Sequence, residues 1–102
     1  MTTSRRVMVR YRVRPDAADE NARLVRAVYD ELASTRPPDF HYATFRLDDG
    51  VSFLHLALED APGASPLPQV TAFQEFQRGI RERCEEPPVV TELTEVGSYG
   101  FG

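Results

Sequence analysis

Tryptophan is absent from this 102-residue chain, and the residues that most often bind metals are scarce, with one cysteine and two histidines. A lone Cys84 excludes an intrachain disulfide framework and gives no support to a cysteine-based zinc site. Two histidines without cysteines or carboxylates clustered at ligand spacing argue against any metal site. We therefore expect a cytoplasmic protein that uses no metal or other cofactor.

Several other signals are missing. No stretch approaches the roughly 20 apolar residues that span a bilayer, and the N-terminal segment lacks the continuous apolar run of a signal peptide. The formal charge of -4 and the pI near 5.1 give no basic footprint for nucleic acid. Neither a glycine-rich phosphate loop nor a serine nucleophile elbow occurs. These absences exclude membrane, nucleic-acid and nucleotide-binding classes.

The composition that remains, 41% hydrophobic and 27% charged, is ordinary for a folded domain. At this length we expect a single domain over residues 1–102. Alternating apolar and polar residues predict a first strand over 7–14. A helix follows, with Asp16 as its cap, and it ends at Arg36 before two prolines. Its buried stripe is expected to contain Leu24, Val25, Val28 and Leu32.

The middle of the chain predicts a β-hairpin. Strand-like segments cover 40–47 and 51–59, and Asp49-Gly50 between them is typical of a tight turn. A two-residue loop places Arg46 opposite Phe53, and it separates the aliphatic residues from the polar ones. A three-residue loop would mix the two kinds on each face, so we favour the shorter loop.

The C-terminal part predicts a second helix and a last strand. The helix is expected to start near Ser65-Pro66 and to continue to Cys84, the end of an apolar stripe. A core role for Cys84 is favoured over a reactive thiol, because its acidic neighbours would not stabilise a thiolate. Pro87 and Pro88 should end the helix, and β-branched residues predict a strand over 89–96.

The resulting βαββαβ order predicts an α+β, ferredoxin-like fold, a four-stranded antiparallel sheet with both helices on one face. We expect aliphatic residues on the helix-covered face, namely Val9, Tyr11, Val13, Ala43, Phe45, Leu47, Leu54, Leu56 and Leu58. The other face is then expected to hold Met8, Arg10, Arg12, Tyr42, Thr44, Arg46, Phe53, His55 and Ala57. That mixture suits neither solvent nor a dry core, so a second sheet across a wet cavity, in a homodimer, would resolve the conflict.

With these elements, and with the segments Tyr42-Ala43-Thr44-Phe45-Arg46-Leu47-Asp48-Asp49-Gly50 and Glu86-Pro87-Pro88-Val89-Val90-Thr91-Glu92, the chain resembles the dimeric α/β-barrel superfamily. It is similar to small uncharacterised proteins related to the antibiotic biosynthesis monooxygenases. The resemblance implies a homodimer with facing sheets and a ligand-sized cavity. Members include oxygenases that need no metal or flavin and haem-degrading enzymes. The missing tryptophan argues against haem degradation, and we expect the sole asparagine, Asn21, to be solvated or internal to its helix.

The predicted site centres on His55, which could act as a general base toward a phenol, with Arg46 or Arg10 stabilising the negative charge that develops. Tyr42 could orient the substrate. Thr44, Phe53 and Arg12 complete the expected ligand-binding set. A structural interpretation remains open, in which the histidine is only hydrogen-bonded at an interface and the arginines pair with carboxylates such as Glu92 or Glu59. The other histidine, His41, is expected to be exposed.

Two functions follow. The first is a cofactor-independent monooxygenase-like enzyme that acts on a small phenolic or polycyclic metabolite. The second is a non-catalytic dimeric module that binds a small ligand. RNA recognition, which uses the same order of elements, is disfavoured because the basic aromatic motifs are absent. The C-terminal Tyr99 and Phe101 either extend over a partner subunit or fray.

Overall fold

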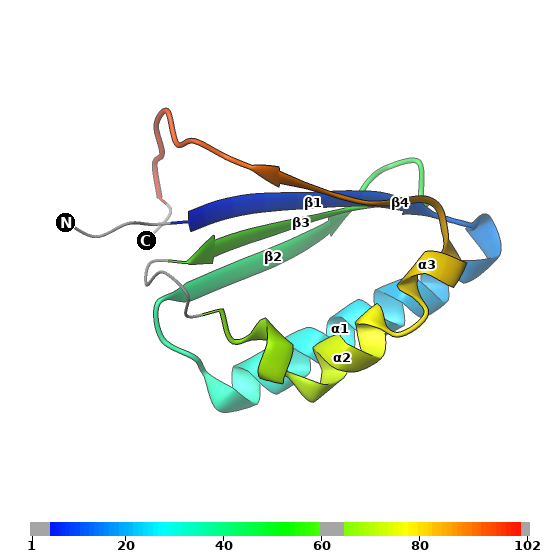
Figure 1. Ribbon diagram of the computed structural model, residues 1–102, viewed down its shortest axis with the longest axis horizontal. Helices are drawn as coiled ribbons and strands as arrows, with labels where there is room; N and C mark the ends of the chain where they lie inside the picture. Colours follow the sequence, from blue (N-terminus) through cyan, green and yellow to red (C-terminus); the bar gives the residue numbers. More distant parts are fainter. Residues whose placement is uncertain (1–4, 60–64, 101–102) are drawn as a thin grey trace.

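The computed structural model describes residues 5–59 and 65–100, and in these ranges one antiparallel sheet is covered by helices on one face (Figure 1). The strand order is β2-β3-β1-β4. This arrangement confirms the ferredoxin-like α+β prediction. The strands are β1 (Arg5–Val13), β2 (Phe40–Arg46), β3 (Ser52–Glu59) and β4 (Cys84–Glu92), and the helices are α1 (Ala18–Thr35), α2 (Thr71–Gln77) and α3 (Ile80–Arg83), with 3-10 turns η1 (Pro15–Ala17) and η2 (Leu67–Gln69).

The first helix, α1, starts later than expected and without a side-chain cap. A 3-10 turn precedes it, and Ala17 rather than Asp16 occupies the cap position. The capping prediction for Asp16 is therefore wrong, because the turn itself supplies the backbone hydrogen bonds. The end of the helix is as expected, since Arg36 adopts a left-handed conformation (φ 48°) directly after Thr35.

The predicted second helix is interrupted. Gly79 adopts a φ of +85° between α2 and α3, a backbone conformation that glycine tolerates best. The expected helix to Cys84 is therefore wrong, and Cys84 is the first residue of β4, half-buried against the core. The start of α2 is held by Glu31 of α1, whose carboxylate accepts the backbone N–H groups of Thr71 and Ala72 at 3.0 and 2.9 Å. No helix in the described ranges has the length and apolarity to cross a membrane.

The last strand also differs from the expected range of 89–96, because β4 includes Pro87 and Pro88. β4 lies at the edge of the sheet and pairs only with β1, and an edge position tolerates the missing N–H of proline. The register places Val9 opposite Val90 and shifts between Arg10 and Arg12. The prolines thus belong to the strand and do not end the helix.

The hairpin register is confirmed, with Arg46 opposite Phe53 and Thr44 opposite His55. The turn is closed by the Gly50 N–H, which donates to the Leu47 carbonyl at 3.0 Å. Asp49 stabilises the turn, because its carboxylate accepts hydrogen bonds from the backbone N–H of Ser52 at 2.8 Å and from the hydroxyl of Ser52 at 2.6 Å.

The assignment of the two sheet faces is wrong for β2 and β3. In β1, Tyr11 and Val13 face the helices as predicted, but their neighbours on that face are Phe53 and His55. The hairpin is paired as expected, but its polar side rather than its aliphatic side packs under the helices. An assignment based on hydrophobicity alone chose the wrong face of the hairpin. The helices supply hydrogen-bond partners, and these allow a polar face to be buried. The outer face instead holds Met8, Arg10, Ala43, Phe45, Leu54, Leu56, Val89 and Thr91.

Candidate functional site

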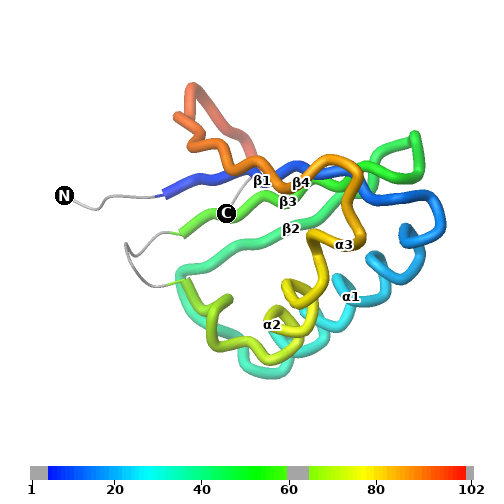
Figure 2. Tube along the Cα trace, turned by 45° about the vertical axis from the view of Figure 1, so that its right-hand side comes forward, coloured from blue at the N-terminus to red at the C-terminus, as the bar shows by residue number. Residues whose placement is uncertain are grey.

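A cavity of about 400 Å³ is lined by residues of the sheet and of the C-terminal helices. Figure 2 shows the path of the backbone through these helices, which lie on one side of the sheet. Its walls are mostly apolar and include Val7, Val9, Leu67, Phe73, Phe76 and Ile80. Polar groups enter it at separate places. Tyr11, Tyr42 and His55 form one group, Arg5 and Glu59 form a second, and Ser65 and Gln77 also line the cavity. Apolar walls with few polar groups are typical of small-molecule sites, and the volume falls in their range.

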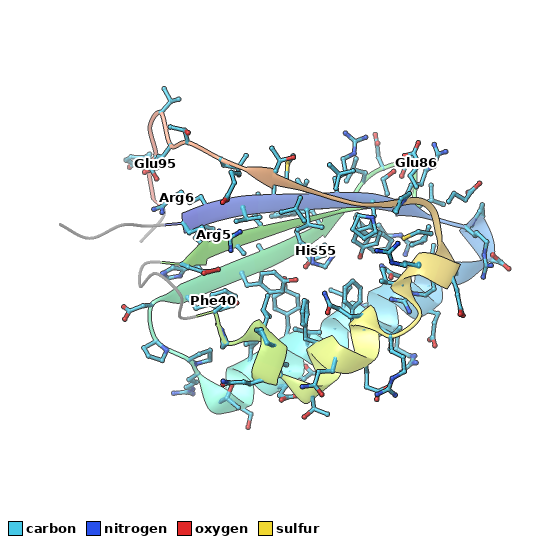
Figure 3. All side chains as sticks on the ribbon, viewed as in Figure 1. Arg5, Arg6, Phe40, His55, Glu86 and Glu95 are labelled. Atoms are coloured by element: carbon cyan, nitrogen blue, oxygen red, sulfur yellow. The ribbon has the colours of Figure 1, made fainter. Side chains whose placement is uncertain are left out.

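His55 is the centre of the first polar group. It projects from β3 into the layer between sheet and helices (Figure 3), and it is 4% exposed. Its Nε2 lies 2.8 Å from the Tyr11 hydroxyl, and its Nδ1 lies 2.7 Å from the Tyr42 hydroxyl. A neutral imidazole has one N–H and one lone pair, so it donates to one tyrosine hydroxyl and accepts from the other. Both ring nitrogens are therefore satisfied inside the protein.

The hydrogen bonds continue from Tyr11 into the helices. Asn21 of α1 is fully buried, and its Nδ2 donates to the Tyr11 hydroxyl oxygen at 2.9 Å. Its Oδ1 accepts from Nε of Arg83 at 3.1 Å, and Arg83 Nη2 donates to the Phe76 carbonyl at 2.6 Å. This chain connects His55 with the end of α3. It fixes the tyrosine from the side opposite the imidazole.

A second branch leaves His55 through Thr44. The Thr44 hydroxyl lies 3.2 Å from His55 Nδ1 and 2.6 Å from the hydroxyl of Tyr29 on α1. The ring of Tyr29 stacks on the ring of Tyr42, with centroids 5.4 Å apart. We call the hydrogen-bonded set of Tyr11, Asn21, Tyr29, Tyr42, Thr44, His55 and Arg83 the His55 network.

Burial dominates the proton equilibria of the network. It lowers the pKa of His55 to about 4, so the imidazole is neutral at physiological pH. Burial also raises the pKa of Tyr29 to about 12 and the pKa values of Tyr11 and Tyr42 further, so all three phenols keep their protons. The resting network is thus uncharged apart from Arg83, whose guanidinium lies 5.4 Å from the Phe76 ring centroid.

The structure brings together only part of the predicted site. His55, Tyr42 and Thr44 meet in the His55 network, and Phe53 is buried beside it, stacked on Tyr11 at 5.6 Å between centroids. Tyr42 and His55 line the cavity, whereas Thr44 and Phe53 are not among the residues that line it.

The three predicted arginines do not line the cavity. Arg46 donates to the Gly50 carbonyl at 2.8 Å and to Asp19 at 3.3 Å, at the hairpin end of the sheet. Arg10 is exposed on the outer face, and Arg12 pairs with Glu86 at 3.4 Å. The expected pairs with Glu92 and Glu59 are made instead by Arg5.

Four residues of the network were not predicted as site residues, namely Tyr11, Asn21, Tyr29 and Arg83. Tyr11 was expected only as part of the helix-covered face. Asn21 was expected to be solvated or internal to its helix, yet it is fully buried and bridges Tyr11 and Arg83. Its position between Ala18 and Ala22 on the buried stripe could have indicated this. Nothing in the sequence connects Tyr29 or Arg83 to His55, because those contacts depend on how α1 and α3 pack. His41 is exposed, as expected.

Within residues 5–59 and 65–100, no group of three or more His, Cys, Asp or Glu side chains could hold a metal ion. Cys84 carries a free thiol whose pKa is raised by burial, which agrees with a core role. Of the C-terminal aromatic residues, Tyr99 is 97% exposed, and Phe101 lies outside the described residues.

Solved structures share this architecture. A candidate antibiotic biosynthesis monooxygenase from Nitrosomonas europaea superposes with a TM-score of 0.75 at 12% identity, covering 100% of this chain and 97% of that one. A second from Caulobacter crescentus CB15 gives 0.73 at 19% identity, covering 94% and 92%. A protein from Pseudomonas aeruginosa gives 0.73 at 18%, covering 95% and 98%. The chain has the antibiotic biosynthesis monooxygenase-like fold.

No protein-family model and no curated protein sequence matches the chain. At 12 to 19% identity, these structures show that the fold is shared, and they assign no role to any particular residue. Since a fold of this kind does not fix an activity, the function has to be argued from the cavity and the His55 network.

Proposed function

We propose that the protein is a small-molecule enzyme of the monooxygenase-like type, acting on a phenolic or polycyclic metabolite in the cavity between sheet and helices. One observation carries this proposal. A buried imidazole, joined to two tyrosine hydroxyls at 2.7 and 2.8 Å, lies at the wall of a mostly apolar cavity of about 400 Å³. The cavity suits a flat aromatic body, and the hydroxyls can hydrogen-bond a phenol or carbonyl.

In the proposed chemistry, proton removal makes the aromatic ring electron-rich enough to react with dioxygen. The Tyr42 hydroxyl would take the phenolic proton while it passes its own to His55 Nδ1. The low pKa of His55 makes it a weak base at rest, but a substrate anion beside it would raise that pKa by charge attraction. In the overall reaction one oxygen atom enters the ring, and the other leaves as water with two substrate hydrogens.

Arg10 and Arg46, which the sequence pattern predicted as charge-stabilising residues, take no part in the proposed chemistry. Both lie outside the cavity lining, and Arg46 is already bonded to Asp19 and to the Gly50 carbonyl. The hydroxyl groups of Tyr11 and Tyr42 line the cavity beside His55, and they are the donors that we assign to a developing anion there.

The test is oxygen uptake with naphthols and hydroxyanthracenes by the wild type and by His55→Gln. The glutamine amide can still bond both hydroxyls but cannot accept a proton, so we expect turnover to fall about hundredfold or more. His41→Gln is the matched control, because it makes the same change at an exposed strand position. Circular dichroism of each variant establishes that it is folded. Undiminished turnover by a folded His55→Gln variant would contradict the assignment of His55 as base.

One observation favours the alternative, a non-catalytic ligand-binding module. Both nitrogens of His55 are already bonded within the protein, as in a purely structural histidine. In that case phenols would bind in the cavity, and the wild type would consume no oxygen with any of them. Binding measured by calorimetry without turnover therefore selects the module over the enzyme.

We further propose that the protein is a homodimer that associates through the outer face of the sheet. Leu54 and Leu56 are only half-buried there, while Phe45 is 52% and Val89 61% exposed. Such an apolar strip across neighbouring strands is a typical association surface. The free thiol of Cys84 agrees with the reducing cytoplasm, which is the location we propose.

A further inference from the structure

Glu59 is a buried carboxylate in the cavity that the chemistry above does not use. It is the last residue of β3, is 5% exposed, and lines the same cavity as His55. Within the described part of the chain its one charged partner is Nη1 of Arg5, 3.9 Å from Oε2. That distance is too long for a hydrogen bond. Its carboxylate oxygens accept no hydrogen bond from the described residues.

Arg5 is a poor counter-ion for Glu59 because it is shared. Its Nε donates to the carboxylate of Glu92 at 3.1 Å, which is much closer than the contact with Glu59. The Arg5 side chain is 52% exposed, so solvent weakens its attraction for both carboxylates. Because Arg5 makes its closer contact with Glu92, which lies outside the cavity lining, the charge of Glu59 is only partly compensated inside the cavity. A cationic group would complete the site.

The two polar parts of the cavity lie along a single strand. His55, Ala57 and Glu59 share the covered face of β3, so the Cα atoms of His55 and Glu59 are about 13 Å apart at the rise of an extended strand. In the strand register Glu59 lies beside Arg5 of β1 and Phe40 of β2. Arg5 and Phe40 lie at one end of the sheet, and Glu86 lies at the other end (Figure 3). Apolar side chains such as Val7 line the cavity between the two parts.

We propose that Glu59 binds a protonated amino group of the ligand, so that the cavity takes an aromatic compound with an aliphatic ammonium side chain. The inference rests on the proposed function, in which the aromatic end lies at the His55 network. The ammonium would donate to the carboxylate in a site of low solvent access, where a charge-assisted hydrogen bond is strong. A neutral or anionic group at this position would leave Glu59 without a donor.

The experiment compares ligands that differ only in the terminal group. Calorimetry on the full chain would use 4-(ω-aminoalkyl)phenols of increasing chain length, their N-acetyl derivatives and the corresponding ω-(4-hydroxyphenyl)alkanoic acids. We expect the best amine to bind about tenfold or more tightly than its N-acetyl derivative, the range of a hydrogen bond to a charged group. Glu59→Gln should remove this preference while the affinity for the N-acetyl compound stays the same. Glu86→Gln, a change at an exposed carboxylate outside the cavity lining, should keep the preference.

A second variant guards against a failure of Glu59→Gln to fold. Arg5→Gln changes a half-exposed side chain and removes the competing cation, so the preference for the amine should increase. Equal affinities for amine and N-acetyl compound, tighter binding of the acid, or no binding of any probe would overturn the inference. If phenols bind and are turned over without a preference for the amine, the proposed role of Glu59 is wrong and the proposed enzyme function stands. A Glu59-dependent preference without oxygen uptake would instead remove the oxygenation and keep the cation site.

Discussion

The two faces of the sheet treat polar groups in opposite ways. Under the helices, Tyr11, Asn21 and His55 are 3%, 0% and 4% exposed, and each is hydrogen-bonded to another member of the His55 network. On the outer face, apolar groups such as Phe45 and Val89 remain more than half exposed. Polarity by itself therefore does not decide which face is covered. A polar face can be buried when neighbouring elements supply every partner.

The two faces should also respond to different changes. A hydrogen bond contributes about 1 kcal/mol net, but a buried group left without its partner costs about 1 to 3 kcal/mol. The covered face is therefore sensitive to the loss or protonation of one member. The outer face has no comparable network, and each leucine buried there by a partner would contribute about 1.5 to 3 kcal/mol. It should be sensitive to charge.

The largest expected effect is on the covered face, through the pH dependence of stability. The pKa of His55 is about 4 in the folded protein against 6.5 for the free side chain, so the unfolded state binds the proton more tightly. Its contribution is complete above pH 6.5 and is lost as the pH falls through 4, amounting to about 3 kcal/mol. Urea unfolding of the wild type at a series of pH values from 7.5 to 4 measures it.

Carboxylates also titrate at the acidic end of this range, so the measurement needs a difference between variants. His55→Gln should lose the His55-linked part of the slope, and His41→Gln, on an exposed strand position, should retain it. If the two variants show the same slope as the wild type, the buried neutral state of His55 is wrong.

On the outer face, the sharpest change is a charge at the centre of the aliphatic strip. Leu56 lies opposite Ala43 on β2 and Met8 on β1. Leu56→Glu should weaken dimerisation about hundredfold, or about 2.7 kcal/mol, because the carboxylate would have to be desolvated without a partner. Sedimentation velocity over a range of concentrations measures it. Thr91→Val on the edge strand is the control and should leave the dimer intact; a dimer that persists unchanged in Leu56→Glu would place the interface elsewhere.

The local structure was more predictable than the packing. Asp49-Gly50 and the alternation on either side define the hairpin and its register, because a one-residue slip would mix apolar and polar residues on each face. The pattern cannot tell which face of the hairpin pairs with which face of β1. That choice depends on the Cα register of β1 against β3, with Tyr11 opposite Phe53, a contact between segments about forty residues apart. Local periodicity contains no information about it.

The site was predictable to the same degree. His55, Tyr42 and Thr44 follow from neighbouring positions in the hairpin, so their proximity could be predicted from the register. Asn21 and Arg83 come from other elements. The role of Arg83 depends on the break in the helix at Gly79, whereas the sequence pattern predicted a continuous helix there. Glu59 looked like an ordinary strand-end carboxylate. Its burial and its position in the cavity lining follow from the packing of the helices on the sheet, which the sequence pattern does not give.

Removing one polar group from each face of the sheet tests how differently the two faces depend on hydrogen bonds. Asn21→Leu replaces a buried amide by an apolar side chain of similar size. It leaves Nε of Arg83 without its acceptor and the Tyr11 hydroxyl with His55 as its one remaining partner among the described residues. We expect a loss of about 2 kcal/mol in the free energy of unfolding, measured by urea denaturation. Thr91→Val removes a polar group of the exposed outer face and should change stability by less than about 0.5 kcal/mol. If both variants are equally stable, the Asn21 bonds do not hold the covered face together, and the helices do so by apolar packing alone.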